Sequence, residues 1–171
     1  MNMPKKFSHV EAPVKLNEFR TVTSEDGTRY YESPGGNYPS VTTVTGFDKQ
    51  AFFKRWRKDN PAESKRVLRR GNDLHKVVED YLNNKNIDLL KHSPVVSTLF
   101  MQMKNTLDKI DNIQALEVPL WSDTLALAGR VDCVAEYNGV LSLIDFKGST
   151  KEKKKYNIEN YFLQATAYSI M

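Results

Sequence analysis

The dipeptide Asn138-Gly139, which lies between two strand-like runs, is the feature that most constrains how this chain can fold. Asn-Gly is the preferred loop of a two-residue type I′ β-hairpin, because that turn needs positive φ at both central residues. With this loop, Tyr137 faces Val140, and every further cross-strand pair follows from the first one. The sequence therefore predicts both a β-hairpin and its register.

The predicted register places charged side chains together on one face of the sheet. Asp132 pairs with Asp145 in this register. Arg130 pairs with Lys147 on the same face, because the side chains of a strand alternate with a period of two. The opposite face is apolar and is expected to pack in the core: Val131, Cys133, Ile144 and Phe146.

The two opposed aspartates indicate a metal site. Directly opposed carboxylates, with Cβ atoms about 5 Å apart, repel each other. A divalent cation between Asp132 and Asp145 removes that repulsion, and carboxylate oxygens are usual ligands of Mg²⁺ and Mn²⁺. The ammonium of Lys147 can hold an attacking water or offset charge in a transition state. The residues alone leave open a second interpretation, an exposed charge cluster in which Arg130 and Lys147 neutralise both aspartates.

Hydrophobic periodicity and turn residues predict an α+β layout for the whole chain. A β-hairpin is followed by helices, a three-strand meander and a last helix, with the helices packed on a small mixed or antiparallel sheet. The aromatic residues Phe52, Phe53 and Trp56 have helical spacing, and we expect them to pack in the core rather than to stack on bases. The expected strands are 29–33, 40–45, 113–120, 125–137 and 140–147, with a turn at 34–37. The expected helices are 48–58, 61–84, 94–110 and 159–170.

Length and composition fit one globular domain. With 171 residues, of which 40% are hydrophobic and 27% charged, the chain has neither a disordered nor a membrane-protein composition. We expect residues 1–27 to form a loose N-terminal segment and residues 28–171 to form the domain. The first residues lack the apolar run of a secretory signal. Cys133 is the only cysteine, so we expect no disulfide and a reducing, cytoplasmic setting.

Basic residues gather in two stretches of a chain whose net charge is +4. A positive charge favours a polyanionic partner such as DNA, whose backbone is contacted by lysine and arginine. For the lysines of residues 151–155, a merely solvated basic face is an equal alternative. The first stretch contains Lys54, Arg55, Arg57, Lys58, Lys65, Arg66, Arg69 and Arg70. The residues that we expect to contact DNA are Arg69, Arg70, Arg130 and Lys151.

Two short segments of the predicted hairpin resemble the signature of the PD-(D/E)XK nucleases. Residues 129–132 (GRVD) match the G-x-V-D part of that signature, and residues 143–147 (LIDFK) end in its D-x-K part. A D-x-K triplet alone is weak evidence, whereas several motifs in the correct order are strong evidence. The resemblance favours the metal site over the neutralised charge cluster.

Further motifs resemble the RecB-like branch of this superfamily. Residues 71–79 (GNDLHKVVE) have the G-x-x-x-H-x-x-x-E spacing of its helical motif. Glu117 matches the acidic residue that this branch carries on the strand before the hairpin, and Gln164-x-x-x-Tyr168 resembles its closing helix motif. Residues 38–43 (YPSVTT) resemble a segment found in phage exonucleases and in the related mitochondrial genome-maintenance exonucleases.

The resemblance covers roughly residues 28–171 and implies a restriction-endonuclease-like core that hydrolyses DNA phosphodiesters with Mg²⁺ or Mn²⁺. The iron–sulfur subset of the family is excluded, since its cluster needs four cysteines. The metal ligands that the resemblance implies are His75, Asp132, Asp145 and Phe146. The catalytic residues that it implies are Glu117, Asp132, Asp145, Lys147, Gln164 and Tyr168.

The function expected from the resemblance is that of an exonuclease on single-stranded DNA or DNA ends, encoded by a phage and acting in replication or recombination. One alternative is a structure-specific endonuclease on the same core. Another is a catalytically inert module that binds DNA or a protein partner. Members of the family carry further strands after the closing helix, so we expect the chain, which ends at Met171, to lack the C-terminal strands.

Overall fold

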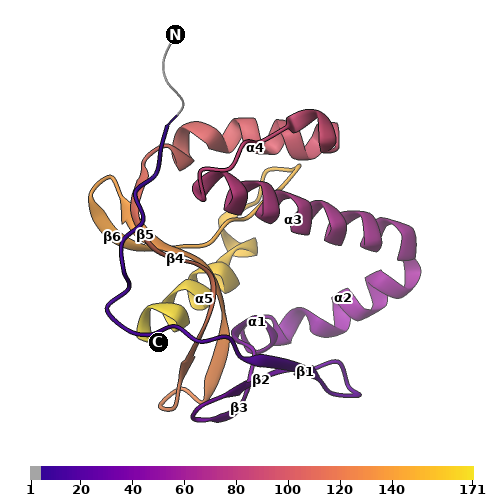
Figure 1. The fold of residues 1–171 in the computed structure, drawn as a ribbon. Coiled ribbons are helices and arrows are strands. Elements are labelled where there is room, and N and C mark those ends of the chain that lie inside the picture. Colours follow the sequence, from indigo (N-terminus) through magenta and orange to yellow (C-terminus); the bar gives the residue numbers. More distant parts are fainter. Residues whose placement is uncertain (1–4) are drawn as a thin grey trace.

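The computed structural model describes residues 5–171, and within them an α+β arrangement of two antiparallel three-stranded sheets and five α-helices (Figure 1). The small sheet consists of β1 (Arg20–Thr23), β2 (Arg29–Ser33) and β3 (Gly36–Pro39). The large sheet consists of β4 (Ile110–Ser122), β5 (Leu127–Tyr137) and β6 (Val140–Ile144). The helices are α1 (Val41–Thr45), α2 (Phe47–Asp59), α3 (Pro61–Leu82), α4 (Pro94–Leu107) and α5 (Glu159–Ile170).

The β5–β6 hairpin has the predicted register. Tyr137 pairs with Val140, and the pairing continues to Cys133 opposite Ile144. Asn138 and Gly139 have φ of 50° and 79°, as a type I′ turn requires. The predicted register is therefore confirmed from Tyr137–Val140 to Cys133–Ile144, whereas the predicted pairs Asp132–Asp145 and Arg130–Lys147 do not form.

The predicted strand 140–147 is too long, since β6 ends at Ile144. The reason lies in the side chain of Asp132, whose Oδ2 atom accepts the backbone N–H of Phe146 at 2.6 Å. The carboxylate of Asp132 therefore accepts a backbone N–H that would otherwise bind a carbonyl of the neighbouring strand. Asp145 and Lys147 consequently lie beyond the last cross-strand pair, on a segment without regular secondary structure.

The prediction of a strand at 40–45 is wrong, because residues 41–45 form the helix α1. Ser40 caps this helix, and its Oγ atom accepts the backbone N–H of Thr43 at 3.1 Å. The strand that pairs with β2 is β3, and the two-residue turn between them is Pro34-Gly35. The capping hydrogen bond outweighs the strand propensity of the β-branched residues in this stretch.

The buried side chains form two main clusters. Figure 1 shows α3 and α4 side by side, and α5 packs against β4 and β6. Val131 and Cys133 lie two residues apart on β5 but belong to different clusters, so the single core face that we predicted is divided. The first cluster, between α3, α4 and the large sheet, includes Leu74, Val78, Leu82, Phe100, Ile110, Cys133 and Phe146. The second, between α1, α5 and β5, contains Val41, Val131, Ala167 and Tyr168.

The N-terminal segment, which we expected to be loose, contributes to the core where the structure describes it. Phe7 and Phe19 are buried, and residues 20–23 form β1. Phe19 joins Tyr31 of β2 and Ala128 of β5 in a third cluster, which fixes the small sheet against the large one. The small sheet therefore packs on β5 through β2, β3 and Phe19, the residue before β1, while the residues of β1 itself are exposed.

The prediction of core packing for the aromatic residues of α2 is wrong. Phe52 and Phe53 are 66% and 44% exposed, and α2 has no buried residue. The helix contacts mainly α1 and α3, so no sheet lies beneath its aromatic side chains. Among the helices of residues 5–171, none combines the length and the hydropathy that a membrane crossing needs.

Candidate active site

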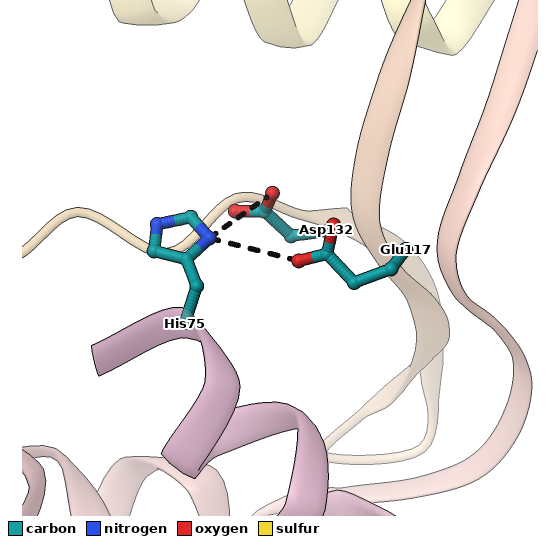
Figure 2. Close-up of side chains that lie close together, drawn as sticks. All are labelled: His75, Glu117 and Asp132. Carbon is teal, nitrogen blue, oxygen red and sulfur yellow. Dashed lines mark ion pairs between the residues drawn. The ribbon is translucent and has the colours of Figure 1, made fainter. Parts of the chain in front are cut away.

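His75, Glu117 and Asp132 converge from three different elements (Figure 2). His75 lies on α3, Glu117 on β4 and Asp132 on β5. The Nδ1 atom of His75 is 3.6 Å from Oε1 of Glu117 and 3.6 Å from Oδ1 of Asp132. One nitrogen or oxygen atom of each residue that could bind a metal lies within 4.8 Å of the corresponding atoms of the other two. The prediction that His75 and Glu117 approach Asp132 is confirmed.

Glu117 owes its position to an irregularity in β4. The pairs on either side of it join Leu116 to Cys133 and Val118 to Val131, so Glu117 stands opposite Asp132. Glu117 has φ of 51°, a left-handed conformation that costs a non-glycine residue roughly 1–2 kcal/mol. Such strain is typical of functional sites, where the surrounding structure holds it in place. Here the carboxylate is thereby directed at the same point as that of Asp132 (Figure 2).

The carboxyl group of Asp132 is the most perturbed acid of the cluster. Its pKa is raised to about 6, mainly by burial and also by the charge of Asp145, while His75 and the N–H of Phe146 act in the opposite direction. The pKa of His75 is raised, above all by its contact with Glu117. Three carboxylates with one imidazole beside them make a site that stabilises a cation.

Asp145 and Lys147 form the second half of the site. The Nζ atom of Lys147 is 2.6 Å from Oδ2 of Asp145, and the side-chain amide of Gln164 donates to Oδ1 of Asp145 at 3.2 Å. Both oxygens of Asp145 therefore have partners. Lys147 also lies over the ring of Tyr161, with its Nζ atom 5.4 Å from the ring centroid. Sequence reasoning missed Tyr161, although its position three residues before Gln164 puts both on one helix face.

Arg130 does not face Lys147 as predicted. Its partner on the β4 side is Pro119, and on the other side β6 ends before the position that would lie opposite Arg130. Its guanidinium forms an ion pair with Glu18 at 2.5 Å and donates to the backbone carbonyl of Glu117. The neutralised charge cluster therefore lacks one of its two cations. In this structure Arg130 holds Glu117 in place, and its contact with DNA stays a prediction.

Tyr168 is buried behind the site. A Cβ atom on Gly129 would lie 2.6 Å from the hydroxyl of Tyr168, so only glycine fits the G-x-V-D motif at this point. Burial raises the pKa of Tyr168 to about 12, which keeps the phenol protonated. Tyr168 therefore contributes packing against β5, and its predicted catalytic role is untested.

An open groove of about 590 Å³ along α3 leads to the cluster of His75, Glu117 and Asp132. Gly71, His75 and Glu117 line it, and a Cβ atom on Gly71 would meet nothing within 4 Å. A smaller cavity of about 180 Å³ on the other side of His75 is lined by Arg70 and Lys147 among others. A Cβ atom at position 71 would therefore be accommodated in this groove without a clash.

The other residues predicted to contact DNA lie outside the cluster. Arg69 is 3.7 Å from Asp73 on the exposed side of α3. Lys151 is exposed in the segment between β6 and α5, where its backbone N–H donates to Ser149. Phe146 is buried in the first cluster, and its backbone N–H binds Asp132. Its predicted place among the metal ligands is untested.

Comparison with known proteins finds similarity to exonucleases. No protein-family model matches the chain. Proteins named mitochondrial genome maintenance exonuclease 1 are similar to it. The mouse protein is 34% identical over 147 residues, which cover 76% of this chain and 43% of the relative. The human protein is 32% identical over 152 residues, which cover 76% and 42%. The protein of Xenopus tropicalis is 32% identical over 150 residues, which cover 78% and 42%.

This chain is therefore a distant homologue of proteins named as exonucleases. It spans less than half the length of these curated relatives, with 42–43% of each relative covered.

Proposed function

We propose that this chain carries the active site of a deoxyribonuclease of the PD-(D/E)XK type, RecB-like branch, which uses Mg²⁺ or Mn²⁺ to hydrolyse DNA from its ends. The observation that carries the proposal is the convergence of His75, Glu117 and Asp132 within 4.8 Å, beside the Asp145–Lys147 pair. The names of the relatives support exonuclease action on DNA. We also propose that the fold of the domain is a restriction-endonuclease-like core.

The donor set suits a hard divalent cation. Asp132, Glu117 and the neighbouring Asp145 offer carboxylate oxygens, which Mg²⁺ and Mn²⁺ prefer, and His75 offers one imidazole nitrogen. Cys133, the thiol that would favour a softer metal, is buried in the core. Asp132 is 8% exposed, so a cation there would offset an unfavourable buried charge. A bound cation would polarise the phosphate and favour ionisation of the attacking water.

Hydrolysis joins a water oxygen to phosphorus and breaks the bond from phosphorus to the leaving sugar oxygen, which takes up a proton. Negative charge grows on the phosphate oxygens as this happens. The ammonium of Lys147, held at 2.6 Å from Asp145, is suited to bind one of those oxygens. Gln164 fixes the carboxylate of Asp145 from α5 and thereby supports the position of Lys147.

The surface of α2 supports single-stranded DNA as the substrate. Phe47, Phe52 and Phe53 are exposed on this helix, among the basic residues Lys54 and Arg55. Exposed aromatic rings stack on unpaired bases, and lysine and arginine bind the phosphates between them. The helix α2 contacts α3, which lines the groove beside His75. A single strand bound on α2 and α3 would therefore reach the cluster through this groove.

The proposal is tested by a time course on single-stranded DNA with Mg²⁺, Mn²⁺ or EDTA. We expect labelled linear DNA to be degraded with either metal, circular DNA to persist, and EDTA to stop the reaction. The Asp132→Asn variant is the matched control, because it keeps the side-chain shape and removes a ligand charge. Cleavage of the circle would show an endonuclease. Cleavage that is unaffected by EDTA or by Asp132→Asn would overturn the metal site.

A further inference from the structure

Tyr161, on the first turn of α5, contacts the lysine of the proposed active site. The Nζ atom of Lys147 lies 5.4 Å from the centroid of the Tyr161 ring. On the same ring, Lys153 approaches to 5.0 Å from the centroid and donates to the hydroxyl at 2.5 Å. A half-buried tyrosine between two lysines thus connects α5 to both ends of the segment that follows β6.

Lys147 needs such a contact because little else fixes its ammonium. Its backbone lies beyond the end of β6, and its side chain is 34% exposed. A lysine side chain is a flexible four-carbon stem, and the ion pair with Asp145, at 2.6 Å, leaves one side of the Lys147 ammonium free for a further contact. An aromatic face attracts an ammonium through its quadrupole, and this attraction adds to the ion pair.

Helix α5 therefore contacts the Asp145–Lys147 pair at two points. Gln164 donates to the carboxylate of Asp145 at 3.2 Å, and Tyr161, one turn earlier, faces the ammonium of Lys147. Residues three apart on a helix lie on one face. Gln164 therefore holds the carboxylate of Asp145, and Tyr161 holds the ammonium of Lys147.

We propose, resting on the function proposed above, that Tyr161 is a positioning residue whose ring holds the Lys147 ammonium against Asp145 for phosphate binding. Lys153 binds the Tyr161 hydroxyl, a contact separate from the one between the ring and Lys147. The ring, rather than the hydroxyl, makes the contact with Lys147. Phenylalanine at this position should therefore serve nearly as well as tyrosine, and an aliphatic residue should not.

The kinetic test compares Tyr161→Leu, Tyr161→Phe and Tyr156→Leu in the full chain on end-labelled single-stranded DNA with Mn²⁺. Tyr156 is the matched control, because it is an exposed tyrosine of the same segment whose ring faces Lys154, with the Nζ atom 5.9 Å from the ring centroid. We expect Tyr161→Leu to lower kcat about fivefold, with KM and the thermal midpoint unchanged. Tyr161→Phe and Tyr156→Leu should retain kcat within about twofold. Wild-type kcat in Tyr161→Leu, or an equal loss in Tyr161→Phe, overturns the proposal.

A second measurement tests the contact between Tyr161 and Lys147 without requiring nuclease activity. The ring of Tyr161 should shift the NMR signals of the Lys147 Cε protons upfield, and Lys147→Arg identifies those signals by their loss. The upfield shift should persist in Tyr161→Phe and vanish in Tyr161→Leu. Should the wild-type chain lack nuclease activity, the proposed function fails, while these shifts still show whether Tyr161 holds Lys147. Unshifted signals in the wild-type protein contradict the inference.

Discussion

The Oδ2 atom of Asp132 accepts the backbone N–H of Phe146 at 2.6 Å, and this one contact shapes the whole candidate site. It ends β6 at Ile144 and leaves the other oxygen of Asp132 facing His75 at 3.6 Å. It also brings Asp145 close enough to raise the pKa of Asp132. The strand end and the acidic cluster therefore have the same origin, the burial of one carboxylate in the large sheet.

Because Asp132 is buried, its ionisation should destabilise the metal-free protein. The contribution of this residue to stability should therefore be less favourable at neutral pH than at acidic pH. Its pKa is raised from 3.8 to about 6 in the folded state. A group whose pKa is raised by folding stabilises the protein fully when the pH is below its pKa in the unfolded state. This stabilisation is lost as the pH rises through its pKa in the folded state. Asp132→Asn should therefore stabilise the metal-free protein at pH about 7.5 by up to about 3 kcal/mol, and only slightly at pH about 4.

Urea unfolding of the wild type and Asp132→Asn in EDTA at both pH values measures this difference. Asp73→Asn, on the exposed side of α3, is a control for a carboxylate outside the cluster. A stability difference between wild type and Asp132→Asn that does not change with pH would contradict the raised pKa.

Divalent metal should reverse this instability. We expect Mn²⁺ or Mg²⁺ to raise the thermal midpoint at pH about 8, since a ligand that binds only the folded state stabilises it. The effect should shrink at pH about 5, because protonation of Asp132, with a pKa of about 6, and of His75, with a raised pKa, removes donors. Differential scanning fluorimetry measures both shifts. Asp73→Asn should respond to metal like the wild type, whereas an unchanged response in Asp132→Asn would exclude Asp132 as a ligand.

The parts of the fold that local chemistry determines could be predicted from the sequence. The Asn138-Gly139 turn fixes its own conformation, so the register from Tyr137 to Cys133 followed without knowledge of the rest of the chain. Glu117 could be assigned by resemblance, yet its alignment with Asp132 depends on a positive φ in β4 that no pattern of the sequence signals.

The features that depend on distant contacts could not be predicted. Phe52 and Phe53 have helical spacing whether or not a sheet lies beneath them, so their exposure follows from where α2 packs. Arg130 is bound by Glu18, which lies far from it in the sequence and outside every recognised motif. The end of β6 depends on a side-chain hydrogen bond across the hairpin, which alternation along the strand does not reveal.

Two glycines should respond to alanine with opposite signs. A Cβ atom on Gly129 would lie 2.6 Å from the hydroxyl and 2.7 Å from Cε1 of Tyr168, so Gly129→Ala should destabilise the protein by about 1–3 kcal/mol. Gly71 lies inside α3 with open space around it, so Gly71→Ala should stabilise the protein by about 0.5–1 kcal/mol. Chemical denaturation of both variants tests the pair. Tyr168→Phe should relieve Gly129→Ala only in part, because Cε1 remains.

Lys147 provides the sharpest test of the chemistry. If its ammonium binds the phosphate as charge develops, Lys147→Ala should lower the cleavage rate by about 10²–10³, while DNA and metal binding remain. If it only neutralises Asp145, at 2.6 Å, its removal should leave the cleavage rate nearly unchanged and tighten metal binding. Single-turnover cleavage with Mn²⁺, together with metal titration and DNA binding, separates the two roles. Lys91→Ala, an exposed lysine outside both basic stretches, is the control and should cleave at the wild-type rate.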